Sequence, residues 1–508
     1  MTERKTAKLR FQRVGAGAAL LLALLLVGGA GAAAPSRGGL LRVVDEAPGG
    51  PFGVPWEIVG ISICAAVPAL EPLLWMDRGG RVMPKLGERW EISPDRRVIT
   101  LHLRKGVKFH DGTDLTAQAV QFNLQKQMER GLIPYFEAVE AVDRDTVRIR
   151  LKGWDNRVLV TLAGTPATVI SPAALERLGL ERARWHPVGT GPFQLERYER
   201  DAYVRYRRFG QYWDRGKPYL DGVEIRFIRD PQTLKAALLA GQIDVTGLQD
   251  LALIAELRGA GFELMAADNA ILTLIPDSAN ADSPFADRRV REALSYAIDR
   301  EAIARGLGFG LLQPTNQLAF PEQSAYLRDY RGPTYNPQRA RELLAQAGYP
   351  NGFSTRLIPA PFIPRDHVLA IQRYLREVGI HAEVEFPEAP RYREYSTRGW
   401  RGILVHFLGF FANYNSFVGF YFVNPPEVWA SMARPAALLQ VFAESVATLR
   451  PEGYKTQQLH RILLQEHLHV TVWRSPRAYV KRPHVQNTNH MKWVTWPWWT
   501  PGEAWIRR

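Results

Sequence analysis

Strand-like and helix-like patterns alternate along almost the whole chain, and this alternation limits the possible folds more than any other feature. Residues 40–44 and 98–104 have the apolar spacing of β-strands. Residues 289–307 place apolar side chains on one face at helical spacing, and Asn336 before a proline, with Gly348 downstream, marks the start and the end of another helix. The alternation predicts a mixed α/β fold.

The composition is that of a folded, globular protein. The chain has 508 residues, of which 46% are hydrophobic and 23% are charged, which is enough for two or three substructures with their own cores. This apolar content excludes a disordered chain. The single cysteine, Cys64, excludes a disulfide framework and any zinc or iron–sulfur site built from several cysteines.

The N-terminus has the pattern of a secretory signal peptide over residues 1–32. Five basic residues precede an apolar core at 19–27, and small residues follow it, with Ala32 at the expected cleavage site. No twin-arginine pair precedes the core, and Cys64 lies too far downstream to carry a lipid. We therefore expect a periplasmic protein that is not a lipoprotein, with an uncleaved anchor helix as the alternative.

The net charge of +14 does not indicate a nucleic-acid-binding protein. The 65 basic residues are spread along the chain singly and in doublets, and they form no basic block. Removal of the leader would leave a net charge of about +10, which we interpret as solvated surface with a weak attraction to anionic lipid. We expect no nucleic-acid partner.

The motifs of common enzyme classes are missing from the sequence. There is no GxxxxGK phosphate loop, no GxGxxG after a strand and no GxSxG elbow. His460, His467 and His469 form the only histidine cluster, but their spacing is poor for a metal, so we interpret them as solvated helix surface. The sequence predicts a protein that is not an enzyme and that needs no cofactor or metal.

The aromatic run 406–422 is the stretch that most suggests ligand binding. Gly, Asn and Ser interrupt it near 412–416, so it combines aromatic walls with polar groups, as a solute pocket does. Core packing would explain the phenylalanines equally well. Asn413 and Asn415 carry more weight, because amides are costly in a core unless they are hydrogen-bonded. Five tryptophans between 493 and 505 indicate instead a C-terminal tail that docks onto a lobe.

Three long motifs carry a resemblance to a known family. They are LHLRKGVKFHDG at 101–112, PVGTGPF at 187–193 with GQIDV at 241–245, and PFADRRVREALSYAIDR at 284–300. With these motifs, the chain resembles the family 5 extracellular solute-binding proteins of ABC transporters, the peptide, nickel and oligosaccharide-binding group. The resemblance covers roughly residues 38–508.

The resemblance implies a bilobal α/β fold of the periplasmic-binding-protein type, with two crossings of the hinge. The first lobe would span 38–270, with an extra subdomain inserted at about 55–170; the second lobe would span 271–475, and the tail 476–508 would return to the first lobe. Solute would bind in the cleft, and closure would bury it. The implied partners are a small-molecule or peptide solute and an inner-membrane ABC permease with a cytoplasmic ATPase. The protein itself is expected to be a monomer.

One departure from the family bears on the ligand. Peptide-binding members resemble one another in a Gly-Trp-x-Ala-Asp-Tyr stretch whose aspartate holds the α-amino group of the ligand. The matching stretch here is 409–414, with Phe410 in place of the tryptophan and Asn413 in place of the aspartate. An asparagine offers one acceptor and two donors but no charge. A neutral solute such as an oligosaccharide is therefore an alternative to a peptide.

The expected ligand-binding residues come from two walls of the cleft. They are Trp56, after the first strand, and Phe407, Phe410, Phe411, Asn413, Tyr414, Asn415 and Phe417 from the aromatic run. Trp56 would equally suit a loop that covers a subdomain junction. The leading function is the substrate-binding component of an ABC importer; the alternative is an exported protein of the same fold that serves as a sensor input or an envelope chaperone.

Overall fold

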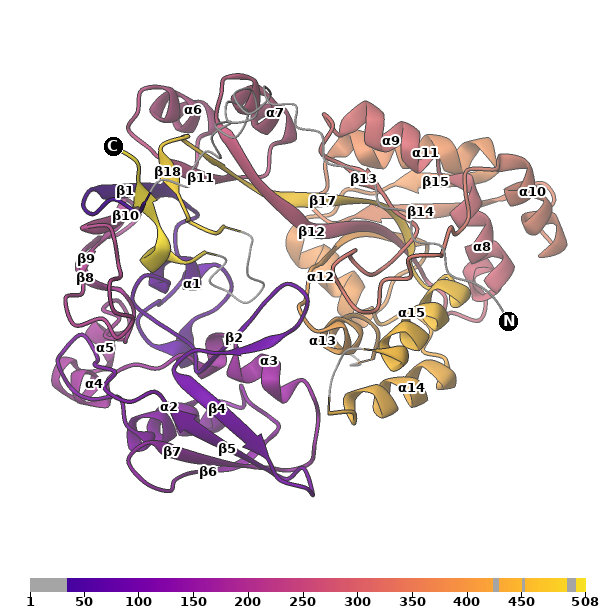
Figure 1. The fold of residues 1–508 in the computed structure, drawn as a ribbon. Coiled ribbons are helices and arrows are strands. Elements are labelled where there is room, and N and C mark those ends of the chain that lie inside the picture. The colour runs from indigo at the N-terminus through magenta and orange to yellow at the C-terminus, as the bar shows by residue number, and fades with distance from the viewer. Residues whose placement is uncertain (1–33, 424–428, 450–452, 491–498) are drawn as a thin grey trace, which may run out of the picture.

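The computed structural model describes residues 34–423, 429–449, 453–490 and 499–508. Two bodies lie side by side and are joined by long strands (Figure 1). The expected signal peptide lies outside the described residues, as do Trp493, Trp496 and Trp498. Within the described ranges, every helix is too short or too polar to cross a membrane.

One eleven-stranded sheet runs through both bodies, in the order β15-β14-β16-β12-β17-β11-β1-β10-β9-β8, with β13 beside β17. Its strands are β1 (Leu40–Val44), β8 (Phe193–Glu199), β9 (Tyr203–Arg208), β10 (Gly222–Arg226), β11 (Val245–Leu248), β12 (Glu263–Pro276), β13 (Gln313–Pro314), β14 (Phe353–Pro359), β15 (Ile380–Val384), β16 (Ile403–Gly409) and β17 (Val470–Lys481). β1 is parallel to β10 and β11, and β14 is parallel to β15 and β16. The predicted mixed α/β fold is confirmed.

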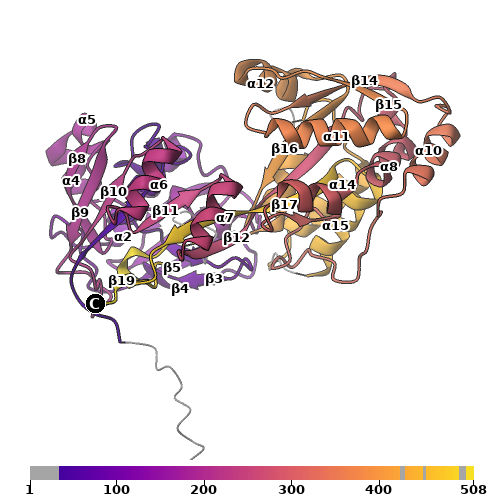
Figure 2. The ribbon, with the colours of Figure 1, turned by 90° about the horizontal axis from the view of Figure 1, so that it is seen from above.

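The long strands β12 and β17 carry the sheet from one body to the other. They pair antiparallel from Glu263 opposite Lys481 to Leu274 opposite Val470, with register shifts after Asp268 and after Leu272. One end of β17 also pairs with β11, and one end of β12 also pairs with β16. Seen from above, α6 and α7 cover one face of the sheet in the first body, and α11 covers it in the second (Figure 2).

The first body, which we call the first lobe, has a core built from separate parts of the chain. Buried apolar side chains of 41–70, 170–245, 479–485 and 499–504 pack together, and the tail residues Trp499 and Trp505 are buried. Its helices are α1 (Ser62–Ala66), α4 (Pro172–Leu178), α5 (Leu180–Ala183), α6 (Pro231–Leu239) and α7 (Leu251–Gly259), and the tail adds the pair β18 (Val485–Gln486) and β19 (Trp505–Ile506).

A second core, formed mainly by residues 73–169, defines the inserted subdomain. Its sheet has the order β4-β5-β7-β6 and lies beside a hairpin of β2 and β3. The elements are β2 (Leu74–Met76), β3 (Val82–Pro84), β4 (Gly87–Ile92), β5 (Val98–Leu103), α2 (Ala117–Glu129), β6 (Phe136–Ala141), β7 (Thr146–Leu151) and α3 (Val158–Leu162). Residues 55–70, which the sequence placed in this subdomain, pack into the core of the first lobe instead.

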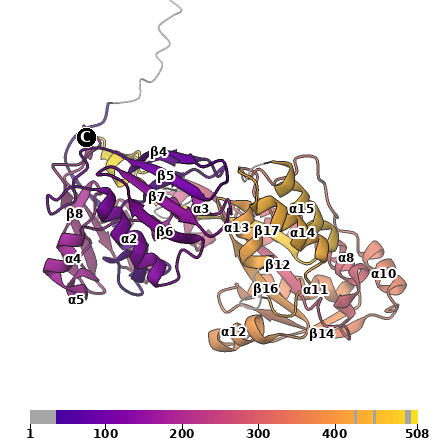
Figure 3. The same cartoon turned by 90° about the horizontal axis from the view of Figure 1, so that it is seen from below.

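The third core, from residues 272 to 473, defines the second lobe. Its helices are α8 (Arg288–Ala297), α9 (Arg300–Leu307), α10 (Pro337–Gln346), α11 (Arg365–Glu377), α12 (Ala389–Arg398), α13 (Tyr414–Val418), α14 (Ala436–Val446) and α15 (Tyr454–Glu466). Seen from below, the inserted subdomain reaches the second lobe near α13 (Figure 3).

The single helix predicted for 289–307 is in fact two helices. Ile298 adopts an extended conformation, and the side chain of Asp299 accepts a hydrogen bond from the backbone N–H of Ala302, so a new helix begins there. The predicted start at Asn336 is confirmed, because its side chain caps α10 by accepting from the N–H of Arg339.

Candidate functional site

The parallel strands of both lobes end at the same place on the hinge. Leu248, at the carboxyl end of β11, lies opposite Ala478 of β17. Gly409, at the carboxyl end of β16, lies opposite Ala270 of β12, which in turn pairs with Ser475 of β17. Since ligands of open α/β sheets bind outside the carboxyl ends of the strands, this convergence marks the candidate ligand cleft.

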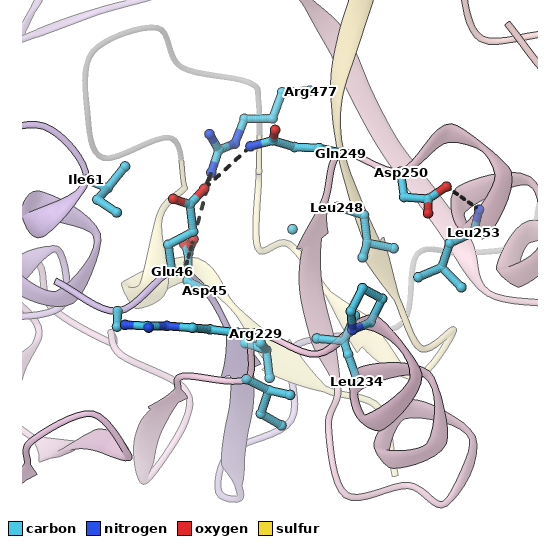
Figure 4. A pocket seen from close by; sticks show the side chains of 15 residues that line it. Asp45, Glu46, Ile61, Arg229, Leu234, Leu248, Gln249, Asp250, Leu253 and Arg477 are labelled. Atoms are coloured by element: carbon cyan, nitrogen blue, oxygen red, sulfur yellow. Dashed lines mark hydrogen bonds and ion pairs between the residues drawn. The ribbon is translucent and has the colours of Figure 1, made fainter. Parts of the chain in front are cut away.

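A cavity of about 520 Å³ forms the first-lobe wall of this cleft, at the carboxyl ends of β1, β10 and β11 (Figure 4). Its apolar lining consists of Ile61, Ile228, Leu234, Leu248 and Leu253. Both the volume and the mixture of apolar and charged lining are typical of pockets that hold a small solute.

The acidic side chains at the end of β1 are paired within the protein. The guanidinium of Arg477 lies 3.8 Å from a carboxylate oxygen of Asp45 and 3.9 Å from one of Glu46, and Gln249 donates to Glu46 at 3.5 Å. Burial raises the pKa of Asp45, and the nearby charge of Arg477 opposes that rise. These groups form one cluster of two carboxylates, one guanidinium and one amide at the back of the cavity (Figure 4).

Arg229 is the cation of the lining that is available to pair with a ligand. Its side chain is exposed and makes no ion pair with any residue in the described part of the chain. It extends beneath Asp45 and Glu46 (Figure 4). The other carboxylate of the lining, Asp250, caps α7 by accepting from two backbone N–H groups. An anionic group in the cavity would therefore meet, in Arg229, a guanidinium that has no ion-pair partner among the described residues.

The second-lobe wall is aromatic. Phe407 lies near the end of β16, and its ring centroid is 5.9 Å from that of Phe362 and 5.2 Å from that of Trp473. Phe410 and Phe411 follow the end of β16. These three phenylalanines are half-buried, and the ring of Phe410 also packs against that of Phe320.

The two predicted asparagines are buried and differ in their partners. Asn413 is the N-cap of α13, where its side-chain oxygen accepts from the N–H of Ser416 at 3.1 Å, and its Nδ2 has no partner among the described residues. Asn415 uses both amide groups: Nδ2 donates to Asn156 of the inserted subdomain, and the oxygen accepts from Ser445. Asn415 therefore connects two parts of the protein.

The remaining predicted residues lie in cores. Tyr414 and Phe417 stack on each other within the core of the second lobe, at exposures of 2% and 0%. Trp56 is 7% exposed in the core of the first lobe, with its ring edge against Phe122. These are the positions of packing residues, and for Trp56 the position suits the junction interpretation.

Sequence reasoning missed the charged and polar residues that line the first-lobe cavity. They are Asp45, Glu46, Arg229, Gln249 and Arg477. Four of them lie just beyond the end of a strand, and this position in the sequence was the available signal.

The histidines near the C-terminus correct another prediction. His460, His467 and His469 are buried, not solvated, and burial lowers the pKa of His460 and His467 to about 4 and that of His469 to about 3. In the described ranges, no three side chains of metal-binding type are placed to hold an ion.

Comparison with known sequences gives the family. Residues 81–423 match the family model of the bacterial extracellular solute-binding proteins, family 5 Middle. The glutathione-binding protein GsiB of Escherichia coli (strain K12) is 33% identical over 371 residues, which cover 70% of this chain and 71% of GsiB.

Solved structures share the fold. HbpA2 from Haemophilus parasuis aligns with a TM-score of 0.81 and 21% identity over 92% of this chain and 100% of its own. The periplasmic binding protein DppA from Helicobacter pylori, in complex with the peptide STSA, aligns with a TM-score of 0.74 and 20% identity over 93% of this chain and 99% of its own. Together with the sequence matches and the converging strand ends, they show that this chain belongs to the family 5 extracellular solute-binding proteins of ABC transporters.

Proposed function

We propose that this protein is the substrate-binding component of an ABC importer, a periplasmic monomer that captures a short peptide or peptide-like solute at the hinge and delivers it to a membrane permease. The observation that carries the proposal is that the strand ends of both lobes meet along β12 and β17, beside a cavity at the ends of the first-lobe strands (Figure 4). Two relatives support the solute class, since GsiB is named for glutathione and DppA holds a peptide.

The two walls of the cleft would recognise different parts of the solute. The half-buried phenylalanines of the second lobe offer apolar surface, and the first lobe offers a cavity with one available cation. A solute that touches both walls binds the closed form more tightly than the open form, and this difference is what drives closure.

Arg229 is the residue that we assign to a carboxylate of the solute. A hydrogen bond between a guanidinium and a carboxylate is roughly twice as strong as one between neutral groups, and its fork shape fixes the direction of approach. The uncharged Asn413 offers no equivalent partner for an ammonium group.

The test is thermal unfolding of the chain without its leader in the presence of single solutes. The panel contains glutathione, di- to tetrapeptides, the same peptides with amidated C-termini, and oligosaccharides. A solute at about a hundred times its Kd adds roughly 2.7 kcal/mol to the unfolding free energy, which is an easily measured shift. We expect free-acid peptides to raise Tm and their amides to have much less effect.

The variant R229Q should lose the difference between acid and amide. R215Q is the matched control, because Arg215 is also exposed in the first lobe and makes no ion pair with the described residues. Peptides that shift the wild type and R229Q equally would remove Arg229 from the site. A response to oligosaccharides alone would replace the peptide class, and silence across the panel would favour the sensor or chaperone alternative.

A further inference from the structure

The turn between β2 and β3 reaches from the inserted subdomain to the second lobe. At its tip, the Nε of Arg78 donates to a carboxylate oxygen of Glu322 at 2.9 Å. A terminal N–H of the same guanidinium donates to the backbone oxygen of Asp268 in the hinge strand β12. The guanidinium carbon lies 4.2 Å from the centroid of the Phe410 ring.

These three groups are the kinds that recognise an organic cation. A carboxylate and a backbone carbonyl accept its hydrogen bonds, and an aromatic face attracts its charge. The side chain of Arg78 is only 13% exposed and that of Glu322 is 31% exposed, so solvent screens the pair less than it screens a surface ion pair. The carboxylate of Asp268 is itself paired with Arg474 at 3.1 Å.

The backbone of the turn fits closely against the second lobe. Gly80 has a φ of +87°, and a Cβ at this position would lie 2.9 Å from the carbonyl oxygen of Ala412. Asp77 braces the turn, because one of its carboxylate oxygens accepts from the backbone N–H groups of Gly79 and Arg81. These hydrogen bonds fix the backbone of the turn, and with it the position from which the side chain of Arg78 extends.

A second contact joins the same two parts of the protein. The Nδ2 of Asn156 donates to the carbonyl of Ser445 at 2.8 Å, its backbone N–H donates to Val446, and Trp154 donates to Thr448. These acceptors lie at the carboxyl end of α14, where helix carbonyls lack partners of their own. The inserted subdomain is therefore held to the second lobe at two separate places.

We propose that Glu322, the carbonyl of Asp268 and the ring of Phe410 form a cation site that Arg78 occupies, and that this site latches the inserted subdomain to the second lobe. The subdomain is continuous in sequence with the first lobe, so the latch bridges the two lobes. In the latched state the face of Phe410 is covered by the protein's own guanidinium. Separation of the lobes on this side requires Arg78 to leave the site.

The cation site is tested by chemical rescue of the variant R78A. This change removes the guanidinium and leaves the three recognising groups in place, so methylguanidinium should bind there. We expect methylguanidinium to raise the Tm of R78A by about 2 °C relative to its effect on the wild type. R81A is the control, because Arg81 lies in the same turn with its side chain 76% exposed and, among the described residues, forms its ion pair with Asp77 of the turn itself. Equal responses of R78A and R81A would overturn the cation site.

The latch is tested by the distance between spin labels on E137C in the subdomain and A437C on α14, measured in the absence of solute. Both positions are exposed, and the natural Cys64 is buried. R78Q and E322Q should shift the distance distribution to longer values, whereas R81Q should match the wild type. A distribution unchanged by R78Q and E322Q would overturn the latch. Neither experiment uses a transported solute, so both results are independent of the proposed function.

Discussion

Three buried asparagine side chains differ in how many hydrogen-bond partners they have, and this difference determines what each contributes to stability. Asn156 and Asn415 each use both amide groups in a buried network, which fixes their orientation. Asn413 uses only its oxygen, and its buried Nδ2 lacks a partner among the described residues. Leaving such a donor unmet costs about 1–3 kcal/mol. If a solute reaches Asn413 when the lobes part, this donor favours an oxygen over an ammonium group.

His460 makes the stability of the fold depend on pH. Its Nε2 accepts from the backbone N–H of Leu318 at 3.1 Å and its Nδ1 lies 2.8 Å from the carbonyl of Ala325, which fits a neutral ring. Burial lowers its pKa to about 4. The unfolded chain, with a pKa of about 6.5, takes up the proton first as the pH falls. The contribution of His460 is therefore complete above about pH 6.5 and is lost progressively toward pH 4.

Between pH 7.5 and pH 5, this single residue should cost the fold roughly 2 kcal/mol. The variant H460N lacks the ionisable ring, so its unfolding free energy should fall less steeply over this range. Urea unfolding at a series of pH values measures the slope. H381N, at an exposed position, should keep the slope of the wild type. A slope in H460N equal to that of the wild type would contradict the assignment.

At the scale of elements, the sequence predicts those features of helices and strands that depend on neighbouring residues in the chain. The cap at Asn336 and the strand at 40–44 are of this kind, and the structure confirms both. The break at Asp299 was missed because the apolar spacing of 289–307 continues across it. Sheet order joins segments hundreds of residues apart, so local patterns do not predict it; the family resemblance supplied the bilobal arrangement.

In the candidate site too, the sequence predicts what depends on neighbouring residues and misses what depends on distant segments. The half-buried phenylalanines 407, 410 and 411 were recognisable from composition, whereas the burial of Tyr414 and Phe417 depends on where α13 begins and which face it turns inward. The cleft charges, such as Arg229, become visible only when β10, β1 and β11 are known to be neighbours.

The seating of the β2–β3 turn is tested by comparing two glycines. G80A adds a methyl group 2.9 Å from the carbonyl oxygen of Ala412, whereas G106A adds one in open space. Both glycines have positive φ, so both variants pay a similar backbone cost of about 1 kcal/mol. We expect G80A to lower Tm by several degrees more than G106A. Equal losses of Tm, measured by differential scanning calorimetry, would show that the turn does not press on the second lobe.

At the scale of the whole molecule, the inserted subdomain is the part that contacts both lobes. On the first-lobe side, the buried carboxylate of Glu71 accepts from Thr190, Tyr212 and Trp213 and pairs with Lys85 at 3.0 Å. On the other side, Asn156 contacts the second lobe at 0% exposure. The buried polar groups of both contacts have hydrogen-bond partners, so we expect the three cores to unfold together and not one by one.

The variant N156A tests this coupling. It leaves the amide Nδ2 of Asn415 without its partner and removes one of the donors to the carbonyl of Ser445, which should lower the unfolding free energy by about 2 kcal/mol. Loss of coupling should also make the urea transition less steep, because less surface is then exposed in one step. N351A, at an exposed turn, is the control and should change neither quantity. A steep transition in N156A would mean that the cores are coupled elsewhere.

The pairing of β12 with β17 has a mechanical consequence for solute capture. The two strands pair from Glu263 opposite Lys481 to Leu274 opposite Val470, so we expect the ribbon to resist stretching and sliding and to yield mainly by torsion about its long axis. The register shifts after Asp268 and Leu272 increase the local twist and concentrate that torsion at the cleft. We therefore expect each lobe to behave as a lever arm, in which a small rotation at the ribbon becomes a large displacement at the rim.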